Sequence, residues 1–386
     1  MLGTNDLQWI ELDNSAFAHN LAVFRAELPA TTRTLFVAKA NAYGHGLEPM
    51  IQMARTEAVE VLGVHSIEEV RAARSWDWTG PIFILGYVAR ACRKEVLALE
   101  AEPTVLDSET LRDYARLGQE RGLPVPIHLE IETGTHRQGI DPAELPTLLE
   151  EVASTASLRL AGLSTHFANI EDTTDSTYAL GQLERFRNAT DPWLARFPET
   201  IRHTACSAAV LTLPETAFDL VRLGIGAYGY WPSRETRISF REAGRSGTSV
   251  EETRLRPVLA WKTRIGQIHH AAAGSYIGYG GTERVTSATR IGMLPIGYSD
   301  GFDRGLSRVG HVLVRGQRAR VLGRICMNIA MVDLTDIPTA EVEDEVVLLG
   351  RQGDEEIRAD DLAALLQTIS YEVVARLPQS IPRYRI

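Results

Sequence analysis

Lys39 stands directly after a short apolar segment, in the sequence FVAKANAYGHG (residues 36–46). Burying an ammonium group costs several kcal/mol of folding free energy unless the group is paired or loses its charge. A lysine at a strand end can also extend its charged tip into solvent. Lys39 is therefore either a solvated strand end or a reactive amine, and its surroundings decide between the two.

Two later segments contain groups suited to binding a phosphate. CSAAV (206–210) has Ser207 at the expected start of a helix, and GIGAYG (224–229) begins with Gly224, where backbone N–H groups can approach an anion closely. GIGAYG also matches the G-x-G-x-x-G pattern of dinucleotide-binding folds, but a charged segment follows it in place of a βαβ unit. The two segments therefore favour a phosphate site over a dinucleotide site.

Eight short apolar or β-branched segments alternate with segments of helical periodicity and are expected to position these residues. They are TLFVA (34–38), EVLGVH (60–65), PIFILG (81–86), PTVLD (103–107), PIHLEI (126–131), LAGLSTH (160–166), IRHTA (201–205) and LVRLG (220–224). Helices are expected between them, for example at 66–76, 107–122 and 141–154. This alternation predicts parallel pairing, and eight units predict a (β/α)8 barrel. An open doubly wound sheet is the alternative, but the glycine spacing after the first strand does not fit it.

The carboxyl ends of the strands are where such a barrel carries its chemistry. The residues expected there include Lys39, Glu130, Glu132, Arg137, His166, Cys206, Ser207, Arg222 and Gly224. Their cationic content indicates an anionic ligand, and the loops after the last two strands are the usual phosphate-binding corner. A lysine opposite that corner can form a Schiff base with a phosphorylated aldehyde, of which pyridoxal 5'-phosphate (PLP) is the commonest. Arg222 would then lie near the pyridine ring.

Two domains are expected, since the 386 residues exceed the size at which a single core stops growing. Residues 1–240 are expected to form the barrel domain, together with a strand that precedes the barrel. Residues 232–257 are charged and lack a period, so they are expected to be the linker. Residues 241–386 are expected to form a mainly antiparallel β domain with one helix at 360–377.

Composition argues against several kinds of partner and location. With 40 Lys+Arg against 50 Asp+Glu the net charge is -10, which argues against nucleic acid or an anionic membrane surface as the main partner. The N-terminal segment MLGTNDLQWIELDNS lacks the apolar core of a signal peptide, and no run approaches the length of a membrane span. Cys92, Cys206 and Cys326 are too scattered for a disulfide framework or a zinc site. We expect a cytoplasmic enzyme with a small-molecule substrate and no metal.

Taken together, these segments resemble the alanine racemase family, whose members join a PLP-binding barrel to a β domain. The resemblance covers nearly the whole chain in the family's order, through WIELDNSAFAHN, VAKANAYGHG, ETGTHRQG, GLSTHFANIEDT, HTACSAA, VRLGIGAYG, GYGGT, LPIGYSDG, GRICMN and TISYEV. It implies a PLP-dependent isomerase of fold type III that interconverts L- and D-alanine and supplies D-alanine for the cell wall.

The resemblance also implies roles for individual residues. Lys39 would hold PLP as a Schiff base and act as one catalytic base, and Tyr279, from the partner subunit of a homodimer, would act as the second. The phosphate contacts would be Tyr43, Ser207, Gly224, Ile225 and Tyr371. Arg222 would face the pyridine nitrogen, and His166 would link it to the tyrosine. The residues at the substrate would be Arg137, Tyr298 and Met327.

The chemistry of racemisation explains why these residue types are needed. It needs two acid–base groups on opposite faces of the external aldimine, because the α-proton leaves one face and a proton returns to the other. Lysine and tyrosine ordinarily have pKa values of about 10, so both pKa values must be lowered for action near neutral pH. Positive neighbours such as Arg137 and Arg222 would lower them. An arginine at the ring nitrogen would also disfavour its protonation and so limit side reactions such as transamination.

Three positions depart from the family's usual pattern. Many members have a carbamylated lysine where this chain has Glu130, so negative charge toward Arg137 would be present without a modification. Cys206 replaces a frequent asparagine, and Asn328, next to Met327, replaces a frequent aspartate. Loss of that acid would relax selectivity, so serine or a broad range of amino acids stays an alternative to alanine.

Two other functions share parts of this plan. An amino-acid decarboxylase of related fold is disfavoured, because CMN (326–328) does not fit the cysteine motif of those enzymes. A non-catalytic PLP carrier would need no second base, and such barrels usually lack the second domain that supplies Tyr279 here.

Overall fold

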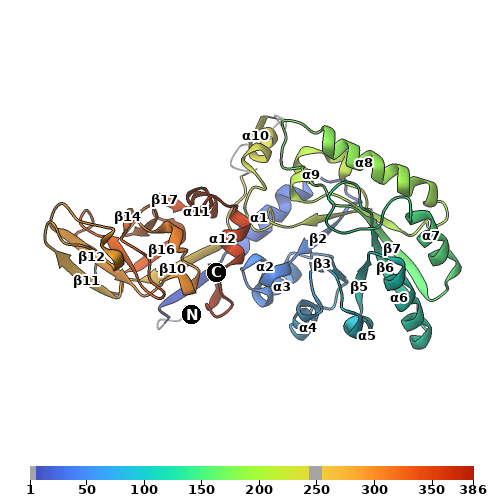
Figure 1. Ribbon diagram of the computed structural model, residues 1–386, viewed down its shortest axis with the longest axis horizontal. Helices are drawn as coiled ribbons and strands as arrows, with labels where there is room; N and C mark the ends of the chain where they lie inside the picture. Colours follow the sequence, from blue (N-terminus) through green and yellow to red (C-terminus); the bar gives the residue numbers. More distant parts are fainter. Residues whose placement is uncertain (1–5, 243–253) are drawn as a thin grey trace. The chain divides into compact units, whose positions relative to one another are not determined.

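The computed structural model describes residues 6–242 and 254–386 of the chain (Figure 1). These residues divide into two compact units. The barrel unit comprises the described residues within Ala18–Ala40 and Met50–Leu255, and the β unit comprises those within Met1–Phe17, Asn41–Pro49 and Arg256–Ile386.

Eight parallel strands form the sheet of the barrel unit, in the order β8-β7-β6-β5-β4-β3-β2-β9. Their bounds are β2 Arg33–Val37, β3 Val61–Val64, β4 Ile82–Ile84, β5 Ala101–Val105, β6 Val125–Glu130, β7 Leu158–Ser164, β8 Ile201–His203 and β9 Leu220–Leu223. The sheet nearly closes between β8 and β9. The backbone N–H of Arg222 donates to the Ala205 carbonyl at 2.9 Å, and an isolated parallel β-bridge joins Cys206 to Arg222. The predicted strands and the (β/α)8 architecture are confirmed.

Helices connect the strands, and in Figure 1 those between β3 and β7 lie outside the barrel. The helices are α1 Asn14–Arg25, α2 Lys39–Tyr43, α3 Leu47–Thr56, α4 Ile67–Ser75, α5 Arg93–Ala98, α6 Ser108–Arg121, α7 Leu145–Ser154, α8 Thr177–Thr190 and α9 Ser207–Thr212. Asp107 caps α6 by accepting the Thr110 N–H at 2.7 Å, and Gly122 ends it at φ +70°. Every helix in residues 6–242 and 254–386 is too short or too polar to span a bilayer.

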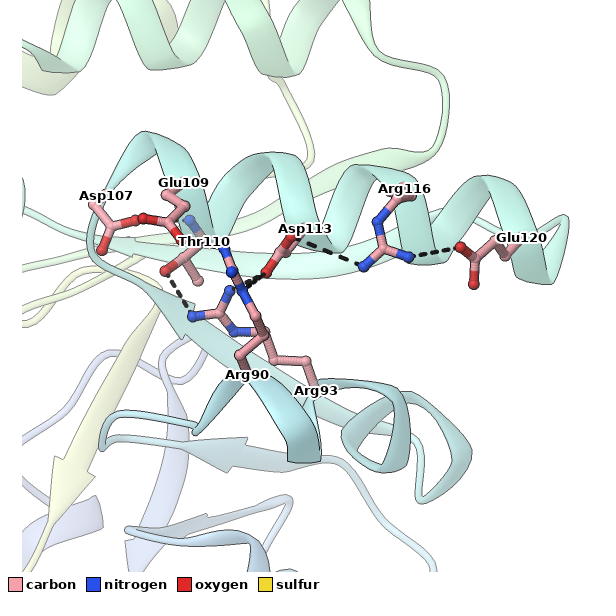
Figure 2. Close-up of polar contacts among 8 residues, drawn as sticks. All are labelled: Arg90, Arg93, Asp107, Glu109, Thr110, Asp113, Arg116 and Glu120. Atoms are coloured by element: carbon pink, nitrogen blue, oxygen red, sulfur yellow. Dashed lines mark hydrogen bonds and ion pairs between the residues drawn. The ribbon is translucent and has the colours of Figure 1, made fainter.

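A group of ion pairs connects α6 to α5 and to the turn before it (Figure 2). Arg93 is buried, and its Nη1 donates to Asp113 at 2.6 Å, while Arg90 Nε donates to the same carboxylate oxygen at 2.9 Å. Arg116 pairs with Glu120 further along α6, at 2.7 Å. A buried guanidinium must keep its carboxylate partner, because an unpaired buried charge is strongly destabilising. The pairs that Arg90 and Arg93 form with Asp113 therefore fix α5 and the turn before it against α6 on the outside of the barrel.

The β unit contains a ten-stranded sheet in the order β11-β12-β15-β14-β13-β16-β10-β1-β18, with β17 paired to β16. Its strands are β1 Gln8–Leu12, β10 Leu259–Arg264, β11 Gln267–Ala271, β12 Thr289–Leu294, β13 His311–Val314, β14 Gln317–Leu322, β15 Ala330–Asp333, β16 Glu345–Gln352, β17 Glu355–Ile357 and β18 Arg383–Arg385. All neighbouring strands are antiparallel except β1 and β18. The mainly antiparallel β domain is confirmed.

Three elements differ from the sequence prediction. β1, expected with the barrel, pairs with β10 and β18, and its buried Ile10 and Leu12 belong to the β unit. The helix expected at 360–377 is two helices, α11 Ala359–Leu366 and α12 Ser370–Ala375, because Gln367 adopts the left-handed conformation (φ +55°) and ends α11. The expected linker contains α10 Arg234–Glu242, and its residues 243–253 lie outside the described part of the chain.

A left-handed turn follows Lys39 within α2. The φ values of Ala40, Asn41, Ala42 and Tyr43 are +54°, +54°, +52° and +51°, and none of these residues is glycine. This conformation costs an L-residue about 1–2 kcal/mol. Asn41 supports the end of the turn, since its carbonyl accepts the N–H of Gly46 and its side-chain oxygen accepts that of Leu47, both at 2.9 Å. The contacts after the turn therefore hold a conformation that the sequence does not favour.

His45 supports the same turn. Its ring is fully buried, and Nδ1 donates to the Tyr43 carbonyl at 2.9 Å. Burial lowers the pKa of His45 to about 3, so the ring is neutral at neutral pH. Arg383 contributes as well, because its Nη2 donates to the Gly44 carbonyl at 2.7 Å. The sequence alone assigns His45 no role, whereas the structure makes it a support of the loop after Lys39.

Gly44 is the position of this loop that tolerates substitution least. It has φ +77°, and a Cβ there would lie 1.8 Å from the Val374 carbonyl oxygen. Gly44→Ala should lower the free energy of unfolding, measured by urea denaturation of the purified protein. The decrease should exceed the cost of about 1 kcal/mol that the left-handed conformation alone imposes on alanine. Gly353→Ala is the matched control in the same unit, because Gly353 has φ +63° and a Cβ there would lie 3.8 Å from the nearest atom. Equal free energies of unfolding for the two variants would contradict the steric argument.

Candidate active site

Lys39 lies at the carboxyl end of β2, where the sequence predicts it, and its side chain is partly buried. Glu69 of α4 fixes the adjacent backbone, since its carboxylate accepts the N–H of Ala40 at 2.6 Å and that of His65 at 2.7 Å. One carboxylate therefore holds both the residue after β3 and the first residue of the left-handed turn after Lys39.

The pKa of Lys39 is lowered from its ordinary value. Burial is the largest cause, and the positive charges of Arg137 and Arg222 lower it further, whereas Glu69 and Glu130 act in the opposite direction. More of the Lys39 side chain is therefore neutral amine near pH 7 than in a solvated lysine. A general base or a Schiff-base lysine requires this property.

Arg222 of β9 is a buried cation whose N–H groups are mostly bound by the protein. Nη1 donates to the carbonyl of His203 and, at 2.8 Å, to its ring Nδ1. Nη2 donates to the carbonyl of Thr165 at 2.7 Å, and the carbonyl of Thr204 and Nδ1 of His166 lie 3.2 and 3.4 Å away. Nε–H has no hydrogen-bond acceptor among the described residues, so it is the donor left for a ligand. A guanidinium can only donate, so this position suits an unprotonated pyridine nitrogen.

His166 follows β7 and is neutral. Burial lowers its pKa to about 3, and the charges of Arg222, Arg137 and Lys39 contribute to the same shift. A neutral imidazole that accepts the Arg222 hydrogen bond at Nδ1 carries its proton on Nε2 and can donate it outward. His166 therefore lies beside Arg222.

Ser207 joins the ends of β8 and β9 at the predicted phosphate corner. Its Oγ accepts the backbone N–H of Gly224 at 3.0 Å and that of Gly226 at 3.4 Å, which leaves the hydroxyl proton free to be donated to an anion. Gly226 has no room for a side chain, because a Cβ there would lie 2.2 Å from the ring of Phe24. Ile225, between the two glycines, is buried. The predicted residues Ser207, Gly224 and Ile225 thus form one corner of the barrel unit.

Cys206 precedes Ser207 and forms with Arg222 the isolated backbone β-bridge at which the barrel nearly closes. Burial raises the pKa of the Cys206 thiol, so the neutral thiol is favoured and a nucleophilic thiolate is not. Its position is structural.

Glu130 and Arg137 lie close enough to interact electrostatically but form no ion pair among the described residues. Gln138 Nε2 instead donates to the Glu130 carboxylate at 2.6 Å. Burial raises the pKa of Glu130, although this hydrogen bond and the charges of Arg222 and Arg137 oppose the increase. Arg137 is exposed, so its guanidinium is accessible to a ligand carboxylate.

A second group of predicted residues lies in the β unit. Tyr279, Tyr298, Met327 and Asn328 line an open pocket of about 530 Å³, together with Arg304, Arg324, Ile325, Cys326 and Ile329. Tyr279 is 71% exposed and lies in a turn between Gly278 and Gly280, both with positive φ. Asn328 Nδ2 donates to Ser299 Oγ at 2.7 Å. The β unit therefore presents an accessible phenol above a pocket that also contains two arginines.

Tyr43 and Tyr371, both predicted phosphate contacts, lie side by side in the β unit. Their ring centroids are 6.1 Å apart, with an angle of 51° between the ring planes. Tyr43 ends the left-handed turn and Tyr371 lies in the first turn of α12. Two phenols so placed can both reach one small anion.

Sequence reasoning missed several residues that the structure brings to these groups. Glu69, His203, Arg304 and Arg324 were not predicted. His203 had a usable signal, since it lies on the predicted strand 201–205 just before the phosphate corner. Glu69 had no such signal, because its carboxylate acts on backbone N–H groups and those leave no trace in the sequence.

Comparison with known proteins assigns both units to one family. The alanine racemase N-terminal domain matches residues 12–232, and the alanine racemase C-terminal domain matches residues 258–385. An alanine racemase of Leptospira interrogans is 40% identical over 380 residues, which cover 97% of this chain and 95% of that protein. One of Halothermothrix orenii is 35% identical over 376 residues, which cover 97% and 96%.

Solved structures agree. An alanine racemase of Clostridium difficile 630 superposes with a TM-score of 0.90 at 28% identity, covering 99% of this chain and 96% of that chain. The Bacillus anthracis alanine racemase with bound L-Ala-P gives a TM-score of 0.87 at 30% identity, covering 98% and 95%. These matches support a racemase over a decarboxylase or a PLP carrier. On sequence and structure alike, the chain belongs to the alanine racemase family.

Proposed function

We propose that the chain interconverts L- and D-alanine with PLP and that Lys39 and Tyr279 are its two proton-transferring residues. The observation that carries the proposal is that Lys39, with its lowered pKa, lies at the same end of the barrel as Arg222, whose Nε–H lacks an acceptor among the described residues. When bound, PLP would supply an electron-withdrawing ring that acidifies the α-proton of the amino acid.

The residues that fit the cofactor fall into two sets. In the barrel unit Lys39 would hold the aldehyde carbon, Arg222 Nε–H would donate to the ring nitrogen, and the Ser207 corner with Gly224 and Ile225 would bind the phosphate. In the β unit, the adjacent phenols of Tyr43 and Tyr371 would donate to a phosphate.

The proton steps belong to two side chains of different units. Lys39 Nζ, as neutral amine, would accept the α-proton from one face of the substrate, and Tyr279 Oη would donate a proton to the other face. The reverse direction exchanges these roles. Arg137 would bind the substrate carboxylate and, through its charge, keep the pKa of Lys39 low. His166 would accept a hydrogen bond from Arg222 and donate one to the Tyr279 phenol, and so would link the two.

Arg222 would also set the course of the reaction. A cation at the ring nitrogen disfavours protonation there, because two positive charges would face each other. Through this effect Arg222 would favour rapid return of the proton to the substrate over transamination.

A homodimer with shared sites is part of the proposal. Tyr279, Tyr298 and Met327 are 71%, 42% and 56% exposed, and large side chains of this kind at one open pocket favour contact with another protein surface. We infer that Tyr279 completes the Lys39 site of the partner subunit. The cytoplasmic location and the cell-wall role stay predictions.

We propose alanine as the substrate, and serine or a broader range of amino acids as the alternative. The second choice is favoured by Asn328, whose neutral amide lies at the pocket where the family often has an acid. Tyr298 and Met327 line the same pocket and would restrict the size of the substrate.

Complementation between two inactive variants tests the shared site. Lys39→Ala should abolish racemisation and the visible absorbance of the Schiff base together, and Tyr279→Phe should abolish racemisation only. Refolding the two as a mixture should restore about one quarter of wild-type activity, because about half of the dimers are mixed and each has one complete site. No recovery on mixing, with dimers confirmed by light scattering, would rule out Tyr279 in trans.

Glu130 leads to a second prediction. A carboxylate needs no carbamylation, so activity should be insensitive to added bicarbonate, and the intact mass of the protein should show no carbamate. Glu130→Lys is the matched control, since a lysine there should make activity depend on bicarbonate. Activation of the wild type by bicarbonate would overturn this assignment.

The effect of Arg137 on Lys39 gives a pH prediction. Arg137 lowers the pKa of Lys39, and the base acts as a free neutral amine once substrate is bound, so removing the charge should raise this pKa and move the ascending limb of kcat to higher pH. Arg137→Gln should show this shift, whereas Arg137→Lys, which keeps the charge, should not. An unshifted profile in Arg137→Gln would show that Arg137 acts on the substrate alone.

A further inference from the structure

Four polar side chains form a continuous hydrogen-bonded chain across the interior of the barrel. Glu102 of β5 lies 2.7 Å from Nε2 of His128 of β6, and Nδ1 of His128 lies 3.0 Å from Nε2 of His203 of β8. Nδ1 of His203 lies 2.8 Å from Nη1 of Arg222 of β9. Arg222 and its partner His203 belong to the site described above, whereas His128 and Glu102 extend that site away from the cofactor.

Donor accounting fixes the direction of every bond in this chain. Arg222 can only donate, so Nδ1 of His203 accepts and its proton is on Nε2. Nε2–H of His203 then donates to Nδ1 of His128, which leaves the His128 proton on Nε2 for donation to the Glu102 carboxylate. If His128 were an imidazolium, its Nδ1–H would point at the Nε2–H of His203, and two donors would meet. The geometry therefore requires two neutral imidazoles between one cation and one carboxylate.

Packing around the two histidines supports this contact. Gly162 of β7, the strand between β6 and β8, leaves room for it, since a Cβ there would lie 2.2 Å from Nδ1 of His128 and 3.0 Å from Nε2 of His203. Phe83 stacks on His128 with centroids 4.1 Å apart and meets His203 edge-on at 5.2 Å. Both histidines are buried. The barrel interior is thus shaped around the hydrogen bond between them.

The far end of the chain is a partly exposed carboxylate. Glu102 lies in the first half of β5, away from the carboxyl ends that carry Lys39 and Arg222, and it lines an open pocket. Burial on its own would raise the pKa of Glu102, but the hydrogen bond from His128, the charge that His128 carries when protonated, and the positive charges of Arg159 and Arg33 give a net lowering. The carboxylate is therefore ionised near neutral pH and can balance the Arg222 charge.

We propose that Glu102 is a positioning residue for Arg222 and acts on it through His128 and His203, which keeps the Arg222 Nε–H directed at the cofactor ring. The inference rests on the proposed function, which places PLP at Arg222. If the carboxylate is lost, both imidazoles can reverse their tautomers, and His203 would then present Nδ1–H to the Arg222 N–H. Two donors would face each other, and the guanidinium would move or lose its compensating charge.

The test uses the holoenzyme, three variants that probe the chain, and two histidine variants that assign the signals. Glu102→Gln removes the charge at nearly constant size, and Gly162→Ala separates the two histidines without changing either. Glu100→Gln is the matched control, because Glu100 lines the same pocket two residues away and contacts neither histidine. Imidazole 15N shifts give the tautomers of the ten histidines, and His128→Gln and His203→Gln assign the two signals.

In the wild type, both histidines should be neutral with the proton on Nε2. Glu102→Gln and Gly162→Ala should change these signals, shift the visible absorbance band of bound PLP and lower kcat several-fold with little change in KM, because neither residue touches substrate. Glu100→Gln should behave as the wild type. A wild-type proton on Nδ1 of either histidine, or a Glu102→Gln enzyme indistinguishable from Glu100→Gln, would overturn the inference. If the wild type binds no PLP or leaves alanine unchanged, the proposed function fails instead, and the tautomers still report on the chain.

Discussion

The buried guanidinium of Arg222 is the interaction on which the rest of the barrel interior depends. A cation removed from water is costly unless its donors are satisfied, and here carbonyls of Thr165, His203 and Thr204 and the ring of His203 accept most of them. These carbonyls come from the ends of β7 and β8, so satisfying Arg222 also holds the closure of the barrel. Burial and, after it, the same positive charge lower the pKa values of Lys39, His166 and His203, which favours the neutral forms of these groups.

The left-handed turn after Lys39 is the second constraint on the site. Four consecutive non-glycine residues in that conformation cost several kcal/mol relative to a right-handed turn. Glu69 holds the start of the turn from the barrel unit, while Asn41, His45 and Arg383 hold its end within the β unit. The chain passes from the barrel unit to the β unit at this turn, so Lys39 and Tyr43 belong to different units although they lie in one short helix.

The elements with strong local patterns were predictable, and those that depend on distant contacts were not. Eight apolar segments alternating with amphipathic helices predicted the barrel, because the periodicity of each segment reflects which face of that strand or helix is buried. β1 was assigned to the wrong unit because its apolar residues fit either core, and only pairing with β10 and β18 decides between them. The helix at 360–377 has one continuous periodic pattern, and the break at Gln367 depends on a single backbone angle.

By itself, the sequence determined the barrel, the β domain and the residue types of the site, because strand periodicity and strand-end position are local properties. It placed Lys39, Arg222, Ser207 and Gly224 at one barrel end on those grounds alone. The tertiary structure decided the protonation of these groups and their partners. Glu102, His128 and His203 are separated by many residues along the chain and meet only because parallel strands bring their inward faces together around Gly162. Burial and hydrogen-bond direction exist only once that packing is complete, and for that reason the linear order of residues could not specify them.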